Sequence, residues 1–205
     1  MNLSGAVISP LENSASGTRD IYLPNQGDHA AGFGFAIDLG GSLSKVVLLQ
    51  RREGEHNNAG RRMHFEHFQT HSIGELIDFL RPLVEEGLSK GVSPVVKATG
   101  GGAHKYGKLF EDELGIRLEP EDEMMCLISG LNFLLREVSS EVFSCDANSG
   151  TLSQNFCEVR DPRTMFPYML VNIGSGVSIL KVGFRSCLLY RFADGAGVGH
   201  ERDVV

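Results

Sequence analysis

The stretch Phe35-Ala-Ile-Asp-Leu-Gly-Gly-Ser-Leu-Ser-Lys45 decides how this chain folds. An apolar run ends at Asp38, a Gly-Gly pair follows, and a second apolar run, Lys45–Leu49, begins at once. Two β-like runs joined through glycines predict a β-hairpin with strands at residues 33–37 and 45–49. The pattern therefore predicts that Asp38 stands at the end of the first strand, beside the turn.

The strand–glycine turn–strand pattern occurs a second time. Tyr168–Ile173 predicts a strand, and Val177–Val182 predicts its hairpin partner across Gly174-Ser-Gly176. Each turn on its own is also compatible with an ordinary hairpin. Two such turns together resemble the way in which actin-like and sugar-kinase folds hold a nucleotide.

The first turn carries residue types suited to a phosphate. Gly40 and Gly41 let backbone N–H groups approach an anion, and Ser42 and Lys45 add a hydroxyl and a positive charge. Asp38 can hold Mg²⁺, usually through water. The turn is not a Walker loop, because the Gly-x-x-x-x-Gly-Lys-Ser/Thr pattern is absent and a strand follows in place of a helix.

The remaining elements are predicted from periodicity and end signals. Ser72 and Glu75 have the spacing of a capping box at a helix start, and Pro82 should kink or reset that helix. Residues 139–165 look irregular. The predicted elements are a strand at 63–70, a helix at 72–88, a strand at 95–99, and helices at 103–114 and 122–138.

Two helix starts carry further candidate residues. Glu123 shares a helix face with Leu127 and Leu131; it either complements the helix dipole or, partly desolvated, acts as a general base. Thr99-Gly-Gly-Gly102 follows a strand and precedes a helix. Its amides either face an anion or form a tight turn.

Composition narrows the class of protein. The 205 residues are 41% hydrophobic and 22% charged, which excludes collagen-like and wholly disordered chains. A net charge of -7 argues against a duplex-DNA binder. The sequence shows neither a signal-peptide pattern nor an apolar run long enough for a membrane helix, and its four cysteines match no zinc framework. We expect a soluble, cytoplasmic protein with reduced cysteines.

Four motifs in order resemble a known family. They are Phe35–Lys45, Ala98–Ala103, Asp122-Glu123 leading to Cys126–Leu131, and Met169–Leu180. Over residues 33–182 the chain resembles the N-terminal part of the eukaryotic-type pantothenate kinases, plant branch. The resemblance implies an α/β lobe of the acetate-and-sugar-kinase/actin-like (ribonuclease H-like) fold, with a mixed sheet, flanking helices and an incomplete second lobe. It also implies ATP-dependent phosphorylation of pantothenate to 4′-phosphopantothenate, the first step of coenzyme A synthesis.

The resemblance also implies roles for residues. Glu123 would be the catalytic base, and Asp38 would hold Mg²⁺ through water. The phosphates of ATP would be bound by Asp38, Gly40, Gly41, Ser42, Lys45, Gly174, Ser175 and Gly176. Pantothenate, or acyl-CoA as a feedback inhibitor, would be contacted by Ser175, Ser178, Gly101 and Gly102. The family is typically a homodimer, and we expect no nucleic-acid or membrane partner.

The domain organisation predicted from the sequence has three parts. Residues 1–31 read as a flexible leader, 32–182 as the kinase-like lobe, and 183–205 as a tail that departs from the family. We therefore expect a truncated chain that loses nearly all turnover on its own. The alternatives are another sugar kinase of the same fold, or a non-catalytic partner of full-length kinase subunits.

Overall fold

A computed structural model describes residues 7–8, 20–23, 34–51, 60–138, 141–146, 153–157, 162–173, 177–183, 186–193 and 196–203. The chain divides into two compact units, Met1–Glu123 and Met124–Val205. The boundaries predicted at residues 31/32 and 182/183 remain predictions.

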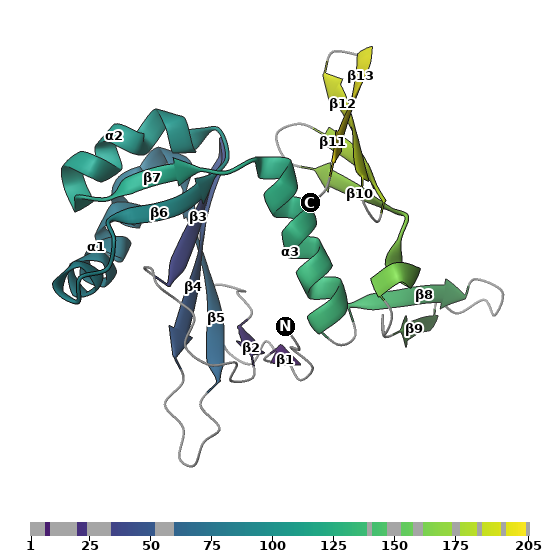
Figure 1. Cartoon of the computed structure of the whole chain (residues 1–205), viewed down its shortest axis with the longest axis horizontal. Coiled ribbons are helices and arrows are strands. Elements are labelled where there is room, and N and C mark those ends of the chain that lie inside the picture. Colours follow the sequence, from purple (N-terminus) through teal and green to yellow (C-terminus); the bar gives the residue numbers. More distant parts are fainter. Residues whose placement is uncertain are drawn as a thin grey trace. The chain divides into compact units, whose positions relative to one another are not determined.

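Unit Met1–Glu123 is built on a seven-stranded sheet (Figure 1) in the order β1-β2-β5-β4-β3-β6-β7. β3, β4 and β5 form an antiparallel meander, whereas β6 pairs parallel to β3 and β7 parallel to β6. This mixed sheet confirms the actin-like fold that the resemblance implies. The strands are β1 (Val7–Ile8), β2 (Ile21–Leu23), β3 (Phe35–Leu39), β4 (Leu43–Arg51), β5 (Arg61–Gln69), β6 (Val95–Thr99) and β7 (Arg117–Pro120).

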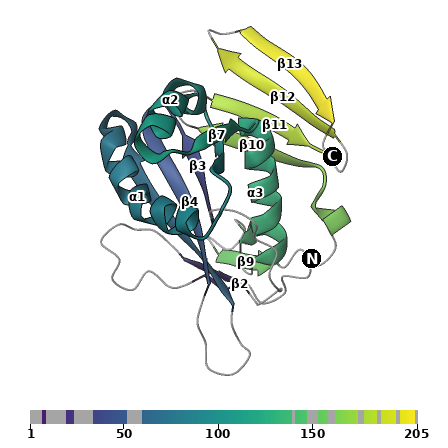
Figure 2. The ribbon, with the colours of Figure 1, turned by 60° about the vertical axis from the view of Figure 1, so that its left-hand side comes forward.

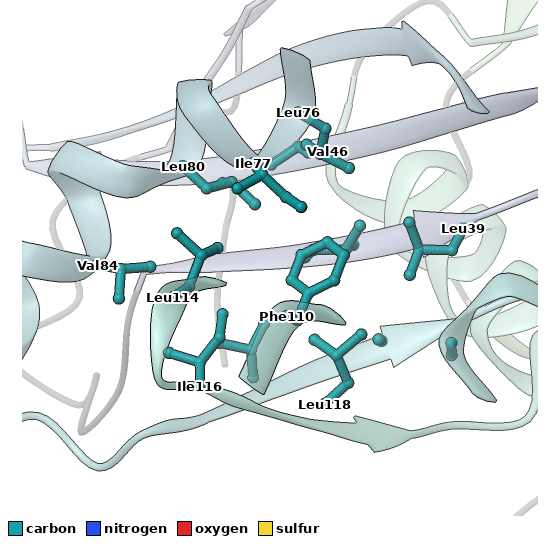
Figure 3. Close-up of a cluster of buried hydrophobic side chains, with 14 of the residues drawn as sticks. Leu39, Val46, Leu76, Ile77, Leu80, Val84, Phe110, Leu114, Ile116 and Leu118 are labelled. Carbon is teal, nitrogen blue, oxygen red and sulfur yellow. The ribbon is translucent and has the colours of Figure 1, made fainter. Parts of the chain in front are cut away.

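Two helices cover one face of this sheet (Figure 2). α1 (Ile73–Ser89) connects β5 to β6, and α2 (Gly102–Leu114) connects β6 to β7. Alternation along β3 turns Ile37 and Leu39 toward the helices. Figure 3 shows the resulting core, in which Phe110 of α2 meets leucines of α1 and β3. Each large apolar side chain buried here contributes about 1.5–3 kcal/mol.

The structure corrects several details of the prediction. Ser72 makes no side-chain cap bond, because it lies in a 3₁₀ turn, Thr70–Ser72, that runs directly into α1. α1 continues through Pro82 as one helix, so of the two predicted effects of Pro82 the reset is wrong and the kink stays a prediction. Two short pieces of the predicted leader form strands β1 and β2. β7 was not predicted, because Arg-Leu-Glu-Pro has one apolar residue and no alternation to mark it.

Unit Met124–Val205 holds a four-stranded antiparallel sheet and most of α3 (Glu123–Glu137). Met124 and Ile128 of α3 pack against Leu180 and Val182. The strands are β10 (Tyr168–Ile173), β11 (Val177–Val182), β12 (Ser186–Ala193) and β13 (Ala196–Asp203). The second predicted hairpin, β10–β11, is therefore confirmed.

Residues 139–165, predicted to be irregular, contain a short hairpin. β8 (Val142–Asp146) pairs antiparallel with β9 (Ser153–Cys157), and a 3₁₀ turn, Pro162–Met165, follows. Phe143 and Phe156 pack ring against ring with centroids 5.7 Å apart, yet both stay exposed. The hairpin escaped prediction because only half of its strand residues are apolar, too few for a sustained strand pattern. No helix in the described part of the chain is long and apolar enough to cross a bilayer.

Candidate phosphate-binding site

Asp38 lies on the sheet face that α1 and α2 leave open. Its neighbours Ile37 and Leu39 point into the core, so the period of two turns Asp38 the other way. Asp38 is opposite Lys45 on β4 and opposite Thr99 on β6. The Lys45 Nζ donates a hydrogen bond to Asp38 Oδ2 at 2.9 Å. The carboxylate and the lysine that the sequence analysis assigns to the first turn therefore form an ion pair.

The turn from Gly40 to Leu43 closes on itself through the Gly40 N–H, which donates to Leu43 O at 3.1 Å. A Cβ on Gly40 would lie 2.7 Å from Leu43 O, so the turn itself requires glycine there. Gly41 differs, because a Cβ at that position would meet nothing within 4 Å. Its missing side chain leaves the backbone open to an approaching ligand.

The Gly100–Gly102 turn packs directly against the end of β3. Gly100 has φ +81, and a Cβ there would lie 2.6 Å from Leu39 O and 2.9 Å from Asp38 Oδ1. A Cβ on Gly102 would lie 2.7 Å from Leu39 Cβ. Packing therefore accounts for these two glycines but not for Gly101, where a Cβ would meet nothing within 4 Å. α2 begins at Gly102, which brings the positive end of its dipole to Asp38.

Two buried hydroxyls that the sequence analysis missed support the first turn. Thr70 Oγ1 donates to Gly40 O at 2.9 Å, and the Thr70 N–H donates to Ser42 O at 2.9 Å. Ser44 Oγ lies 3.0 Å from Thr70 Oγ1. The available signal was Ser44 itself, since a hydroxyl at a core position of an alternating strand needs a partner.

Glu123 is exposed as the first residue of α3, where a carboxylate complements the helix dipole. The buried residues of the helix are Met124 and Ile128, whereas Leu127 and Leu131 on the predicted apolar stripe are only half-buried. The helix was thus predicted at the right place with its most buried face misassigned.

The chain just before Glu123 is anchored to β6. The Glu121 N–H donates to Ala98 O at 2.7 Å, and Thr99 Oγ1 donates to Glu121 O at 3.0 Å. Lys97 pairs with Glu121 and, at 3.1 Å, with Glu119. Hydrogen bonds from Lys97 to Glu121 and then to Glu119 raise the pKa of Lys97. These contacts fix the backbone two residues ahead of the candidate base.

The second hairpin, β10–β11, carries the other predicted glycine-rich turn. Gly174, Ser175 and Gly176 lie outside the described residues. Ser178 is half-buried on β11, opposite Asn172 of β10. It belongs to unit Met124–Val205, whereas Asp38, Lys45 and the two turns that pack beside them belong to unit Met1–Glu123.

For a metal ion the first turn offers the carboxylate of Asp38. No group of three or more His, Cys, Asp or Glu side chains among the described residues could enclose a cation. One carboxylate beside a phosphate turn nevertheless fits Mg²⁺, which keeps several waters and takes its other ligands from substrate phosphates. Asp38 thus fits a Mg²⁺–phosphate complex rather than a protein-enclosed ion.

Three proteins from different organisms illustrate the similarity of this chain to known sequences. The chain is 37% identical over 196 residues to pantothenate kinase 2 of Arabidopsis thaliana, an alignment that covers 79% of the chain and 21% of that protein. It is 37% identical over 196 residues to pantothenate kinase of Schizosaccharomyces pombe, covering 89% of the chain and 47% of that protein. It is also 34% identical over 174 residues to 4′-phosphopantetheine phosphatase of Mus musculus, covering 72% of the chain and 20% of that protein.

The family is settled by the extent of the match. The chain spans between about a fifth and about a half of the length of these relatives. The Fumble family model matches residues 34–198, well over half of the chain. That range includes both hairpins and every candidate site residue. The chain therefore belongs to the Fumble family of eukaryotic-type pantothenate kinases.

Proposed function

We propose that the chain binds the phosphates of ATP at the Asp38 turn and serves the phosphorylation of pantothenate to 4′-phosphopantothenate. The observation that carries the proposal is the packing of the Gly100–Gly102 turn against Leu39 and Asp38, beside the Gly40–Leu43 turn and the Asp38–Lys45 ion pair. The chain is also similar to proteins named pantothenate kinases. In phosphoryl transfer a protein contributes mainly positioning and charge stabilisation. In this proposal the turn that follows β3 supplies both the positioning and the charge stabilisation.

Each residue at the turn has a chemical role in this proposal. The bare Gly41 amide and the Ser42 hydroxyl donate to phosphate oxygens, and Lys45 contributes positive charge. The Asp38–Lys45 pair is exposed, with 33% and 59% of the side chains accessible, so changing partners costs Lys45 little. Mg²⁺, when bound, neutralises phosphate charge, and Asp38 would hold it through water.

Glu123 supplies the base in this proposal. Its carboxylate accepts the proton of the pantothenate hydroxyl while that oxygen forms a bond to the γ-phosphorus and the bond from phosphorus to the leaving ADP oxygen breaks. Gly101 and Gly102, together with Ser175 and Ser178, would contact pantothenate or an acyl-CoA inhibitor. The second set of phosphate donors would be the turn Gly174–Gly176. Homodimerisation and a cytoplasmic location belong to the same proposal.

Two alternative functions, a sugar kinase and a non-catalytic partner, would give different results in an assay. A sugar kinase of the same fold would phosphorylate a hexose in place of pantothenate, so a substrate panel separates the two. A non-catalytic partner would bind a longer kinase chain without turnover of its own. The mouse relative is named for a phosphatase, which makes a direct assay of the reaction necessary.

The test measures 4′-phosphopantothenate formed by the purified 205-residue chain from ATP, Mg²⁺ and pantothenate. Glu123→Gln should abolish turnover, and Glu137→Gln, at the other end of α3, should leave it unchanged. Calorimetry with Mg-ADP measures nucleotide binding separately. Binding without turnover would support the phosphate site and agree with the expectation that the chain alone loses nearly all turnover. If the chain showed no binding and no turnover, the proposal would be overturned.

A further inference from the structure

Thr70 lies beneath the first glycine turn and makes two contacts to it. It follows β5 directly, and 5% of its surface is accessible. Its hydroxyl donates to Gly40 O at 2.9 Å and its backbone N–H donates to Ser42 O at 2.9 Å. Two carbonyl oxygens of the turn are therefore drawn toward one buried residue.

Ser44 completes this arrangement from β4. The hydrogen of the Thr70 hydroxyl is used toward Gly40, so Ser44 Oγ, 3.0 Å away and fully buried, donates to Thr70 Oγ1. The bonds run in one direction, from Ser44 through Thr70 to the Gly40 carbonyl. Chains of hydrogen bonds polarise and strengthen one another inside a protein.

The Thr70 hydrogen bond also sets the direction of an amide. In a planar trans peptide the C=O of one residue and the N–H of the next point in opposite directions. Drawing Gly40 O inward therefore aims the Gly41 N–H outward. Gly41 is exposed, and no backbone oxygen of a described residue accepts a hydrogen bond from its N–H.

We propose that Thr70, supported by Ser44, is a positioning residue that aims the Gly41 N–H at a phosphate oxygen. The inference rests on the proposed function and adds a residue that touches neither nucleotide nor pantothenate. Without the Thr70 hydroxyl the peptide between Gly40 and Gly41 is free to turn over. A turned peptide presents a carbonyl oxygen to the phosphate, which repels it.

The test compares substitutions by their dissociation constants for Mg-ADP, measured by calorimetry on the full chain. Thr70→Val keeps the shape and removes the hydroxyl; we expect about tenfold weaker binding. Thr70→Ser restores the hydroxyl and should bind within about twofold of the unsubstituted chain, while Ser44→Ala should fall between them. Hydrogen exchange at the Gly41 amide should change in Thr70→Val and return to normal in Thr70→Ser.

A stability control separates positioning from simple loss of structure. Val84→Ala removes buried methyl groups from α1 and should lower the melting temperature while leaving the dissociation constant unchanged. If Thr70→Val does not fold, Ser44→Ala against Val84→Ala decides the question. Equal affinity for all variants would overturn the positioning role alone. No binding by the unsubstituted chain would overturn the proposed function and this inference with it.

Discussion

The two glycine-turn hairpins share a pattern and differ in their surroundings. In β3–β4 Ile37 is opposite Val46, and in β10–β11 Val171 is opposite Ile179. β3 has a neighbour on both sides, β4 and β6, whereas β10 has only β11 among the strands the structure describes. The strand–glycine turn–strand pattern thus begins with an interior strand in one sheet and with an edge strand in the other.

The difference shows in burial. Ile37 and Leu39 are 2% and 0% accessible beneath α1 and α2. At the corresponding positions of the second hairpin, Val171 and Ile173 are 46% and 76% accessible. α3 packs on the opposite face of β10, where Leu170 contacts its core cluster. An alternating apolar strand therefore fixes which residues share a face, and the packing partner decides which face is buried.

The largest effect is expected from shortening side chains at corresponding positions of the two hairpins. Ile37→Ala should cost about 2–5 kcal/mol, because it leaves a cavity in a packed core. Val171→Ala should stay within about 0.5 kcal/mol, because its side chain is already accessible. Urea unfolding followed by circular dichroism measures both. A comparable loss from Val171→Ala would break the comparison by showing that its exposed face is covered in solution.

A second test uses the glycine turn that packs against β3. Gly100→Ala should cost about 1–3 kcal/mol, because φ is positive and the methyl group would meet Leu39 O at 2.6 Å. Gly101→Ala, with nothing within 4 Å, should leave stability unchanged within about 0.5 kcal/mol. Thermal unfolding of both variants checks this. If Gly101→Ala proved as costly as Gly100→Ala, the contact between the turn and β3 would not be the cause.

The smallest expected effect on stability is at Asp20, which directly precedes β2 and accepts hydrogen bonds from Arg62 and His64 of β5 in the same sheet. Burial raises the pKa of Asp20, but hydrogen bonds from Arg62 at 2.6 Å and His64 at 2.7 Å outweigh it and hold the pKa below the usual 3.8. A depressed pKa contributes stability above the unfolded value, and that stability is lost as pH falls through the folded one.

The unfolding midpoint, measured from about pH 7 to about pH 3, tests this contribution, because that range includes the usual pKa of a carboxyl group. Asp20→Asn should be less stable than the unsubstituted chain by about 1 kcal/mol at neutral pH. The two curves should converge as the pH falls below the usual value of 3.8. A constant gap down to the lowest pH would show that the charge of Asp20 is not what holds β2.

Local signals in the sequence were sufficient for both hairpins, for the three helices and for the Asp38 turn. Glycine pairs, period-two alternation and helical spacing each depend on neighbouring residues only. β7 is too short and too polar for a local pattern to mark it. Ser44 at a core position signalled that its hydroxyl needs a partner, but that the partner is Thr70, 26 residues away, depends on the folded sheet. The face of α3 was misassigned for the same reason, since Met124 and Ile128 are buried by Leu180 and Val182.

The parallel pairing of β3 with β6 also has a consequence during synthesis. β3, β4 and β5 can pair once Gln69 has left the ribosome, but the second edge of β3 waits for β6, which ends at Thr99. At about 5–20 residues per second, the intervening 30 residues take about 1.5–6 s. For that interval a nascent apolar strand has an open edge, the kind of surface that chaperones shield.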